Sequence, residues 1–218
     1  MIDLDKLATY PLFNNIKKED LKNVLGCSYI AYKTFSKGDY LAMTDDEIHY
    51  IGIICKGSVQ MIKEDYWGNK TILLHMHTGE VFGETFVCSA SFLSQVSFIT
   101  TEKTEIMFLD YYKVMHTCSS SCPHHNKLIS NMLRCIGEKN IKLMEKVEVV
   151  SKKTLRDKIM TYLAIEAKNQ GNNEFTIQFS RIELSEYLCA DRSAVTRELA
   201  SMRDDGLIEF EKNLFKIL

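Results

Sequence analysis

The stretch FSRIELSEYLCADRSAVTRELASMRDDGLI, residues 179–208, decides the fold of the C-terminal third of the chain. Ser180 followed three residues later by Glu183 is the pattern of a capping box, so a helix is predicted to begin at Arg181. The CAD segment that follows predicts a tight turn, after which Asp191 is a good N-cap for a second helix. The stretch therefore predicts two closely spaced helices, as in a helix–turn–helix.

The second helix of this pair is predicted to have two distinct sides. Val195, Leu199 and Met202 repeat at spacings of four and three, which indicates the core side. The other side carries two arginines and two hydroxyl residues in pairs one turn apart: Arg192, Ser193, Thr196 and Arg197. A planar guanidinium can grip guanine O6 and N7 together, or two phosphate oxygens. This side is therefore predicted to enter the DNA major groove.

The predicted interface extends beyond the second helix. Ser180 and Arg181 lie at the start of the first helix, where backbone N–H groups also face a phosphate. The terminal segment GLIEFEKNLFKIL predicts a hairpin around Lys212 and Asn213 that would form a wing beside the groove. Together these elements predict a winged helix–turn–helix.

Bulk charge gives this prediction no support. The chain has 27 basic and 29 acidic side chains and a net charge of −2, so affinity for DNA must come from local charge placement. All six arginines lie beyond residue 133. An alternative is that the helix arginines are surface residues paired with acidic neighbours, namely Asp191, Glu198 and Asp204. The agreement of capping box, turn, core spacing and hairpin favours DNA binding.

The N-terminal part has a different pattern. Residues 11–25 predict one short amphipathic helix with Leu21, Val24 and Leu25 on one side. Residues 29–110 are short runs rich in Ile, Val, Thr, Tyr and Phe, which predict an antiparallel barrel or roll. Glycines stand at the breaks between these runs: Gly38, Gly57, Gly68 and Gly79.

A long helix is predicted over residues 125–150. Its apolar positions follow a heptad spacing over Ile129, Leu133, Ile136, Asn140, Leu143, Val147 and Val150. A lone Asn140 at an a position is typical of a two-stranded parallel pairing with a fixed register. The alternative is a core helix packed within its own subunit, with Asn140 reaching water. The regular spacing favours a dimer.

These segments resemble the CRP/FNR family of bacterial transcription regulators over nearly the whole chain. The matching C-terminal pattern is R-x-E-L-x-x-Y-L, D-R-S-A-V-T-R-E-L and M-R-D-D-G-L-I, while TFSKGDYL, GIICKGSVQMIKE and GEVFGE are similar to the family's roll signatures. The resemblance implies an α+β chain in three parts. These are a jelly-roll-like sensor β-roll domain with an N-terminal helix at 1–124, a dimerisation helix at 125–150 and a winged helix–turn–helix at 151–218.

The resemblance further implies a homodimeric cytoplasmic regulator, not an enzyme, that binds a double-stranded DNA operator. RNA polymerase would be a partner if the protein activates transcription. Two positions depart from the family pattern. Cys189 stands where glycine is usual, which predicts a left-handed backbone there. Ser193 stands where glutamate is often found, which changes the expected base preference.

The resemblance also implies an effector pocket in the roll. Gly83 and Glu84 match the family's sugar-binding positions, but Ser94 and Gln95 stand where an arginine and a hydroxyl residue are expected. A buried phosphate without a cationic partner is costly, and residues 1–133 contain no arginine. An unidentified small-molecule effector other than cyclic AMP, smaller or less anionic, is therefore predicted, and no cofactor is required.

A redox- or metal-responsive regulator is the main alternative. It would use soft or borderline ligands in the CSSSCPHH segment: Cys118, Cys122, His124 and His125. Pro123 interrupts the local helix, and residues 1–26 lack the cysteine cluster of the family's iron–sulfur sensors. We therefore expect no metal.

A cupin-like metal enzyme fused to a DNA-binding domain is a less favoured alternative. His75 and His77, with Glu80 nearby, resemble the ligand spacing of cupins. Strand alternation instead places the apolar residues Ile72, Leu74 and Met76 inward and the histidines outward.

Compartment is suggested by simple features. Seven irregularly spaced cysteines do not resemble a disulfide framework, which favours a reducing cytoplasm. The acidic N-terminus lacks an apolar run, so no signal peptide is expected. No stretch approaches the roughly 18 apolar residues of a membrane span.

Overall fold

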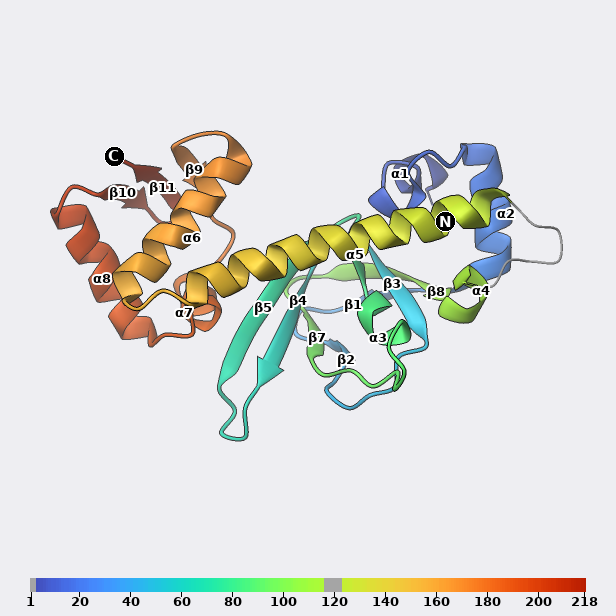
Figure 1. Ribbon diagram of the computed structural model, residues 1–218, viewed down its shortest axis with the longest axis horizontal. Helices are drawn as coiled ribbons and strands as arrows, with labels where there is room; N and C mark the ends of the chain where they lie inside the picture. The colour runs from blue at the N-terminus through green and yellow to red at the C-terminus, as the bar shows by residue number, and fades with distance from the viewer. Residues whose placement is uncertain (1–2, 116–122) are drawn as a thin grey trace. The chain divides into compact units, whose positions relative to one another are not determined.

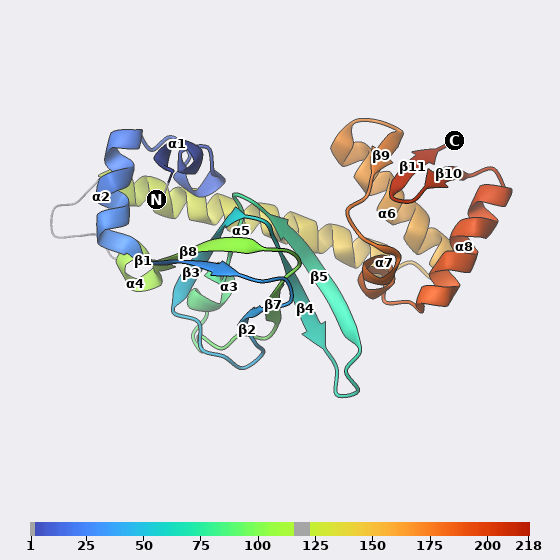
Figure 2. The same ribbon diagram turned by 180° about the vertical axis from the view of Figure 1, so that it is seen from behind.

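The computed structural model describes residues 3–115 and 123–218, and its contacts divide the chain into two compact units. The first unit comprises residues 1–68 and 74–140, and the second comprises residues 69–73 and 141–218. Figure 1 and Figure 2 show the elements from opposite sides. The three-part boundaries expected from the sequence stay predictions. The α+β fold class, with antiparallel sheets, a long helix and a C-terminal helix–turn–helix, is confirmed.

Short helices open the first unit: α1 (Leu4–Leu7), η1 (Pro11–Phe13) and α2 (Lys18–Ser28). The prediction of one helix over residues 11–25 is therefore wrong. Asn15 adopts a left-handed φ of 60°, which interrupts helical geometry between η1 and α2. The apolar side of α2 is as predicted, because Leu21, Val24 and Leu25 are buried.

Two four-stranded sheets form the roll. One has the order β1 (Tyr29–Phe35), β8 (Thr104–Asp110), β3 (Tyr50–Lys56) and β6 (Val81–Phe82). The other has the order β2 (Tyr40–Ala42), β7 (Ser97–Thr100), β4 (Ser58–Glu64) and β5 (Lys70–His77). Short helices α3 (Glu84–Val87) and α4 (Tyr111–Met115) follow β6 and β8.

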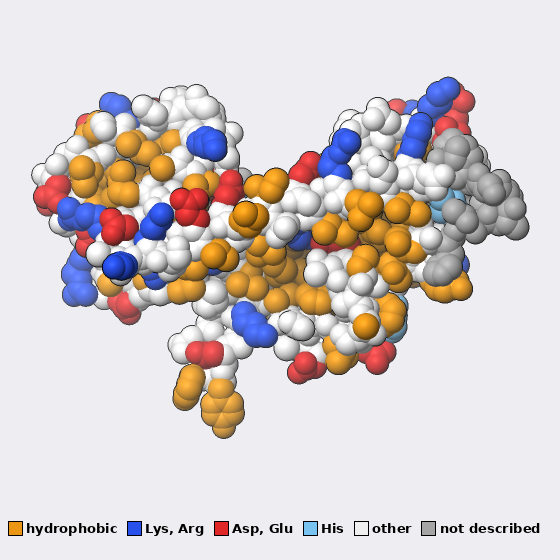
Figure 3. Space-filling model, in the orientation of Figure 1, with side chains coloured by type: hydrophobic (Ala, Val, Ile, Leu, Met, Phe, Trp, Pro, Cys, Tyr) orange, Lys and Arg blue, Asp and Glu red, His pale blue; other side chains and the backbone are white. Residues whose placement is uncertain are grey.

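Glycines end several of these strands because the backbone turns through positive φ. Positive φ values occur at all four predicted breaks: Gly38, Gly57, Gly68 and Gly79. At Gly57 a side chain is also excluded by space, since a Cβ would lie 2.6 Å from Thr104 Oγ1 and 2.8 Å from the Lys103 carbonyl oxygen. The tip between β4 and β5 presents Tyr66 and Trp67 to solvent. The space-filling view shows hydrophobic side chains at the end of a projecting tip (Figure 3).

The long helix α5 (Pro123–Val150) begins with proline, which is favoured at the first helical position. One side of its N-terminal half packs on the first unit, where Leu128 and Met132 are buried. The Asn131 amide donates to the carbonyls of Leu12 at 3.0 Å and Asn14 at 2.8 Å. α5 is thus a core helix on one side, as the alternative interpretation held, and has a second side that faces solvent.

The second unit contains α6 (Leu155–Gln170), α7 (Arg181–Leu188) and α8 (Arg192–Asp204). Its sheet has the order β10 (Ile208–Glu211), β11 (Leu214–Ile217) and β9 (Glu174–Thr176). The β10–β11 hairpin is the predicted wing. Across the described residues, every helix is too short or too polar to cross a membrane.

Candidate nucleic-acid interface and sensor site

Helix α7 begins where the sequence predicted. The Ser180 backbone N–H donates to Glu183 Oε2 at 2.8 Å, and the Glu183 N–H donates to Ser180 Oγ at 3.3 Å. This reciprocal pair is the predicted capping box. It satisfies two backbone donors that would otherwise lack a helical partner, and it fixes where α7 starts.

The turn between α7 and α8 uses a left-handed residue. Cys189 has φ 50° and ψ 53°, as expected for a position where glycine is usual. Asp191 then caps α8, and its Oδ1 accepts from the Ser193 and Ala194 N–H groups at 2.8 and 3.0 Å. The Ser193 hydroxyl donates to the same oxygen at 2.6 Å. These hydrogen bonds, that of the Ser193 side chain foremost, lower the pKa of Asp191.

The outer side of α8 is open. Val195, Leu199 and Met202 are buried, as predicted, whereas Arg192 and Arg197 are exposed. Neither guanidinium makes a hydrogen bond or ion pair with a residue that the structure describes. The acidic neighbours in the alternative interpretation have other partners, since Asp191 caps α8, Glu198 pairs with Arg156 and Asp204 pairs with Arg203.

The two hydroxyl residues on this side are exposed and partly engaged. The Ser193 hydroxyl belongs to the Asp191 cap, and the Thr196 hydroxyl donates to the Arg192 carbonyl at 3.0 Å. Both hydroxyl oxygens can still accept hydrogen bonds. The side therefore offers two cations and two short polar groups over one helical turn, a set suited to base edges and phosphates.

Arg181 has a different arrangement from the arginines of α8. Its Nη2 donates to the Lys212 carbonyl at 2.5 Å, and its guanidinium carbon lies 5.2 Å from the Phe210 ring centre and 5.0 Å from that of Phe215. Burial lowers the pKa of Arg181. The side chain ties the start of α7 to the wing. Contact of Ser180 or Arg181 with a phosphate stays a prediction.

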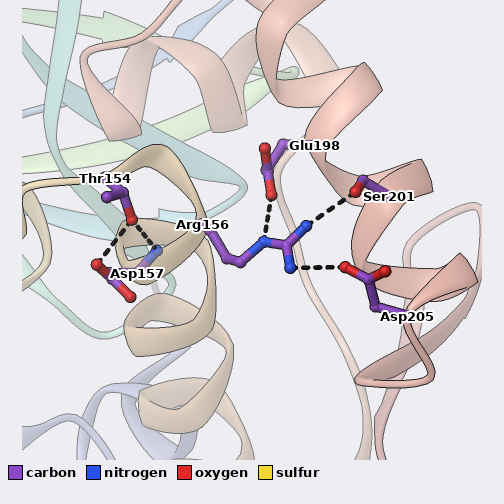
Figure 4. Close-up of polar contacts among 6 residues, drawn as sticks. All are labelled: Thr154, Arg156, Asp157, Glu198, Ser201 and Asp205. Atoms are coloured by element: carbon purple, nitrogen blue, oxygen red, sulfur yellow. Dashed lines mark hydrogen bonds and ion pairs between the residues drawn. The ribbon is translucent and has the colours of Figure 1, made fainter.

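Arg156 positions α8 and was missed by sequence reasoning. From α6, its Nε donates to Glu198 at 2.6 Å, Nη1 to Asp205 at 2.6 Å and Nη2 to the Ser201 hydroxyl at 2.8 Å (Figure 4). These bonds raise the pKa of Arg156, that with Glu198 foremost. The signal in the sequence that could have identified Arg156 is its residue type, since the chain has six arginines.

The candidate sensor site includes Glu84. Gly83 precedes it with φ 86°, and a Cβ there would lie 2.9 Å from the Tyr50 carbonyl oxygen. The Glu84 side chain is fully buried, and its Oε1 lies 2.6 Å from Lys139 Nζ of α5. The Thr85 hydroxyl donates to the same oxygen at 3.1 Å, and Lys139 also donates to the Val81 carbonyl at 2.8 Å.

The other two predicted pocket residues have their own contacts. Ser94 is fully buried, and its hydroxyl donates to the Val96 carbonyl at 2.6 Å. Gln95 is exposed, and its carbonyl accepts from Lys63 Nζ at 2.7 Å. The contacts of Glu84 involve neither residue, so a shared pocket of Gly83, Glu84, Ser94 and Gln95 stays a prediction. Lys139 was missed because it lies 55 residues from its partner.

Metal ligation finds no support in the described part of the chain, where no three His, Cys, Asp or Glu residues group to hold an ion. Cys118 and Cys122 lie outside the described residues, as does the side chain of His124. His125 is buried, with Nε2 3.2 Å from the Lys113 carbonyl oxygen.

The apolar residues of the cupin-like segment alternate as predicted, since Ile72, Leu74 and Met76 are buried. The histidines do not simply face outward, because His75 and His77 are half-buried and both ring nitrogens of His75 are buried. The rings of His75 and His77 lie 4.5 Å apart between centres.

Comparisons with known proteins agree with this arrangement. Residues 32–121 match the model of the cyclic nucleotide-binding domain, and residues 157–218 match that of the Crp-like helix-turn-helix domain. A search of curated protein sequences finds no match.

Solved structures share the fold. The c-di-GMP responsive global regulator CLP of Xanthomonas campestris has a TM-score of 0.75 at 17% identity, over 92% of this chain and 99% of that chain. A CooA mutant from Carboxydothermus hydrogenoformans has a TM-score of 0.71 at 15% identity, over 94% and 92%. FixK2 from Bradyrhizobium japonicum has a TM-score of 0.66 at 13% identity, over 86% and 91%.

Proposed function

Because the chain belongs to the CRP/FNR family of DNA-binding transcription regulators, which are not enzymes, we propose that it binds a two-fold operator as a homodimer. In this proposal Arg192 and Arg197 of α8 contact base edges and phosphates in the major groove, with Ser193 and Thr196 beside them. Ser180 and Arg181 add phosphate contacts at the edge, with Arg181 also holding the wing.

The observation that carries the proposal is the state of the two α8 arginines. Both are exposed and make no ion pair with described residues, in a chain whose net charge is −2. Three hydrogen bonds from Arg156 of α6 hold α8 and the residue that follows it, and Asp191 caps the N-terminus of α8. A helix held in this way, whose two guanidinium groups make no ion pair with described residues, is suited to direct readout of bases.

Dimerisation through α5 is supported by a largely apolar stripe that other described residues do not fully cover. This stripe, the α5 seam, comprises the exposed residues Leu133, Asn140 and Val147 and the half-buried residues Ile129, Ile136 and Leu143. Leu133 and Val147 expose 64% and 62% of their surface, and contiguous exposed apolar side chains mark interaction surfaces. Ile141 and Met144 widen the stripe. In the proposed dimer, a second copy of α5 covers these side chains.

The roll is the proposed sensor of an unidentified small molecule other than cyclic AMP, with no cofactor required. Its match to the cyclic nucleotide-binding domain supports a small-molecule site, while Ser94 and Gln95 offer no charge for a phosphate. An effector would shift the population of α5 arrangements and so re-aim the two DNA-binding domains. We place the protein in the cytoplasm, with RNA polymerase as a partner if it activates transcription.

Selection from a random duplex library tests the proposal. The purified chain is expected to enrich two inverted half-sites whose centres lie about 34 Å apart, one helical turn of DNA. Arg134→Ala, which removes an exposed arginine of α5, serves as a control that should enrich the same sequence. Failure to enrich any sequence, or enrichment of an isolated half-site, would contradict the proposed two-fold binding.

A further inference from the structure

The buried ion pair between Glu84 and Lys139 occupies the position that the family resemblance gives to an effector. We infer that Lys139 takes the place of an effector at Glu84 and holds α5 on the roll, so that the protein binds its operator without an added ligand and a small molecule sensed by the roll would act on this operator-binding state. This inference rests on the proposed function, because its readout is operator binding. It concerns residues of the first unit only, to which both partners belong.

The pair of Glu84 and Lys139 is buried and closely hydrogen-bonded. Only 9% of the Lys139 surface is exposed to solvent and none of the Glu84 surface is, so both charged groups are removed from water. The ammonium makes two short hydrogen bonds, to Glu84 Oε1 at 2.6 Å and to the Val81 carbonyl at 2.8 Å. Buried charges are tolerated only with such pairing, and removal of one partner leaves the other uncompensated.

The partners of Lys139 lie on two different elements of the roll. Val81 belongs to β6 and Glu84 opens α3, while Gly83 between them turns with φ 86°. One ammonium group therefore ties α5 to both ends of this turn. A ligand that binds between a roll and a neighbouring helix would make the same kind of link, with groups of its own in place of the lysine.

The pair also restricts what can enter the site. Oε1 of Glu84 already accepts from Lys139 and from the Thr85 hydroxyl at 3.1 Å. A sugar hydroxyl would have to displace one of these donors before it could bind Oε1, whereas Oε2 is buried and has no hydrogen-bond partner among the described residues. Because the carboxylate is neutralised by the chain itself, binding there gives a ligand little net stabilisation beyond the contact it replaces.

Operator binding by ligand-free variants tests the inference. The measurement is fluorescence anisotropy with the enriched operator, on protein purified through unfolding and refolding to remove small molecules. Wild type and the control Lys142→Met are expected to bind equally without ligand. Lys139→Met is expected to bind about tenfold more weakly or worse, because it leaves Glu84 buried and uncompensated.

Two further variants separate a specific pair from a general loss of folding. Lys139→Arg keeps the cation and is expected to restore most of the affinity. The double variant E84Q/K139M is expected to bind no more weakly than Lys139→Met, since coupled residues give non-additive losses. A double variant that binds more weakly than Lys139→Met would overturn the inference, as would wild-type affinity in Lys139→Met.

Wild type that binds the operator only after cyclic AMP or cyclic GMP is added would also overturn the inference, while leaving operator binding intact. That result would mean that Lys139 leaves Glu84 to neutralise a ligand phosphate. If neither wild type nor any variant binds a duplex with or without these nucleotides, the proposed function itself fails, and the inference fails with it.

Discussion

Lys146 gives the C-terminal end of α5 a pH-dependent contact with α7. Only 4% of its surface is exposed, and its ammonium donates to the Tyr187 carbonyl and lies 3.9 Å from the centre of the Tyr187 ring. Burial lowers the pKa of Lys146 from 10.5 to about 8, with Lys158 contributing in the same direction and Cys189 opposing it. The charged amine is therefore less favourable in the folded chain than in the unfolded chain.

The lowered pKa of Lys146 makes the free energy of unfolding depend on pH, because the folded and unfolded chains bind different numbers of protons. Between pH 8 and 10.5 the unfolded chain binds more protons at this residue, so the free energy of unfolding rises with pH across this window. At 1.36 kcal/mol for each pKa unit, the whole interval corresponds to about 3 kcal/mol, of which about 2 kcal/mol is gained between pH 7 and pH 9.5.

Urea unfolding followed by circular dichroism measures this contribution. Lys146→Met removes the titrating group, so the wild-type free energy of unfolding should rise by about 2 kcal/mol relative to this variant between pH 7 and pH 9.5. Comparison with Lys153→Met, which removes an exposed lysine nearby, cancels titration elsewhere in the chain. A constant difference between wild type and Lys146→Met at all pH values would refute the reasoning.

Three other predictions concern the DNA-binding domain and the dimer. Arg156→Lys should weaken operator binding severalfold in anisotropy titrations. One ammonium group cannot reach Glu198, Ser201 and Asp205 together. Unchanged affinity would show that operator binding does not depend on these contacts to α8. Ser180→Ala should lower the free energy of unfolding by about 1 kcal/mol in urea, because the capping box is lost. Leu133→Asp should convert dimers to monomers in sedimentation experiments, since it places an unpaired charge in the α5 seam. A dimer of unchanged stability would argue against that seam.

Local chemistry explains what could be predicted from the sequence. The caps at Ser180 and Asp191 depend on hydrogen bonds over two or three residues, so their pattern is readable without tertiary structure. The left-handed turn at Cys189 was predicted from the family resemblance, in which glycine is usual at this position. The core sides of α2 and α8 were readable from spacing, because burial of a helix face imposes its period on the sequence.

Contacts between distant segments explain what could not be predicted. Glu84 meets Lys139 across 55 residues, and Arg156 meets Glu198 across 42. No spacing rule connects such positions. The cation near Glu84 was also missed because the family resemblance directed attention to an arginine, whereas the structure has Lys139 there. The break between η1 and α2 was missed because the left-handed conformation at Asn15 has only a weak sequence signal, the tolerance of asparagine for positive φ.

The most direct test of operator recognition by α8 is the salt dependence of operator binding. Binding is measured for wild type, for Arg192→Ala and Arg197→Ala, and for the control Arg134→Ala. Each protein is tested on the selected operator and on operators with single base changes. Loss of a bidentate base contact at Arg192 should cost about 1–3 kcal/mol and relax preference at one base position. Loss of a phosphate contact at Arg197 should reduce the slope of log affinity against log salt by about one. Binding curves of both variants that superimpose on those of wild type at every salt concentration would contradict the assignment of α8 as the recognition helix.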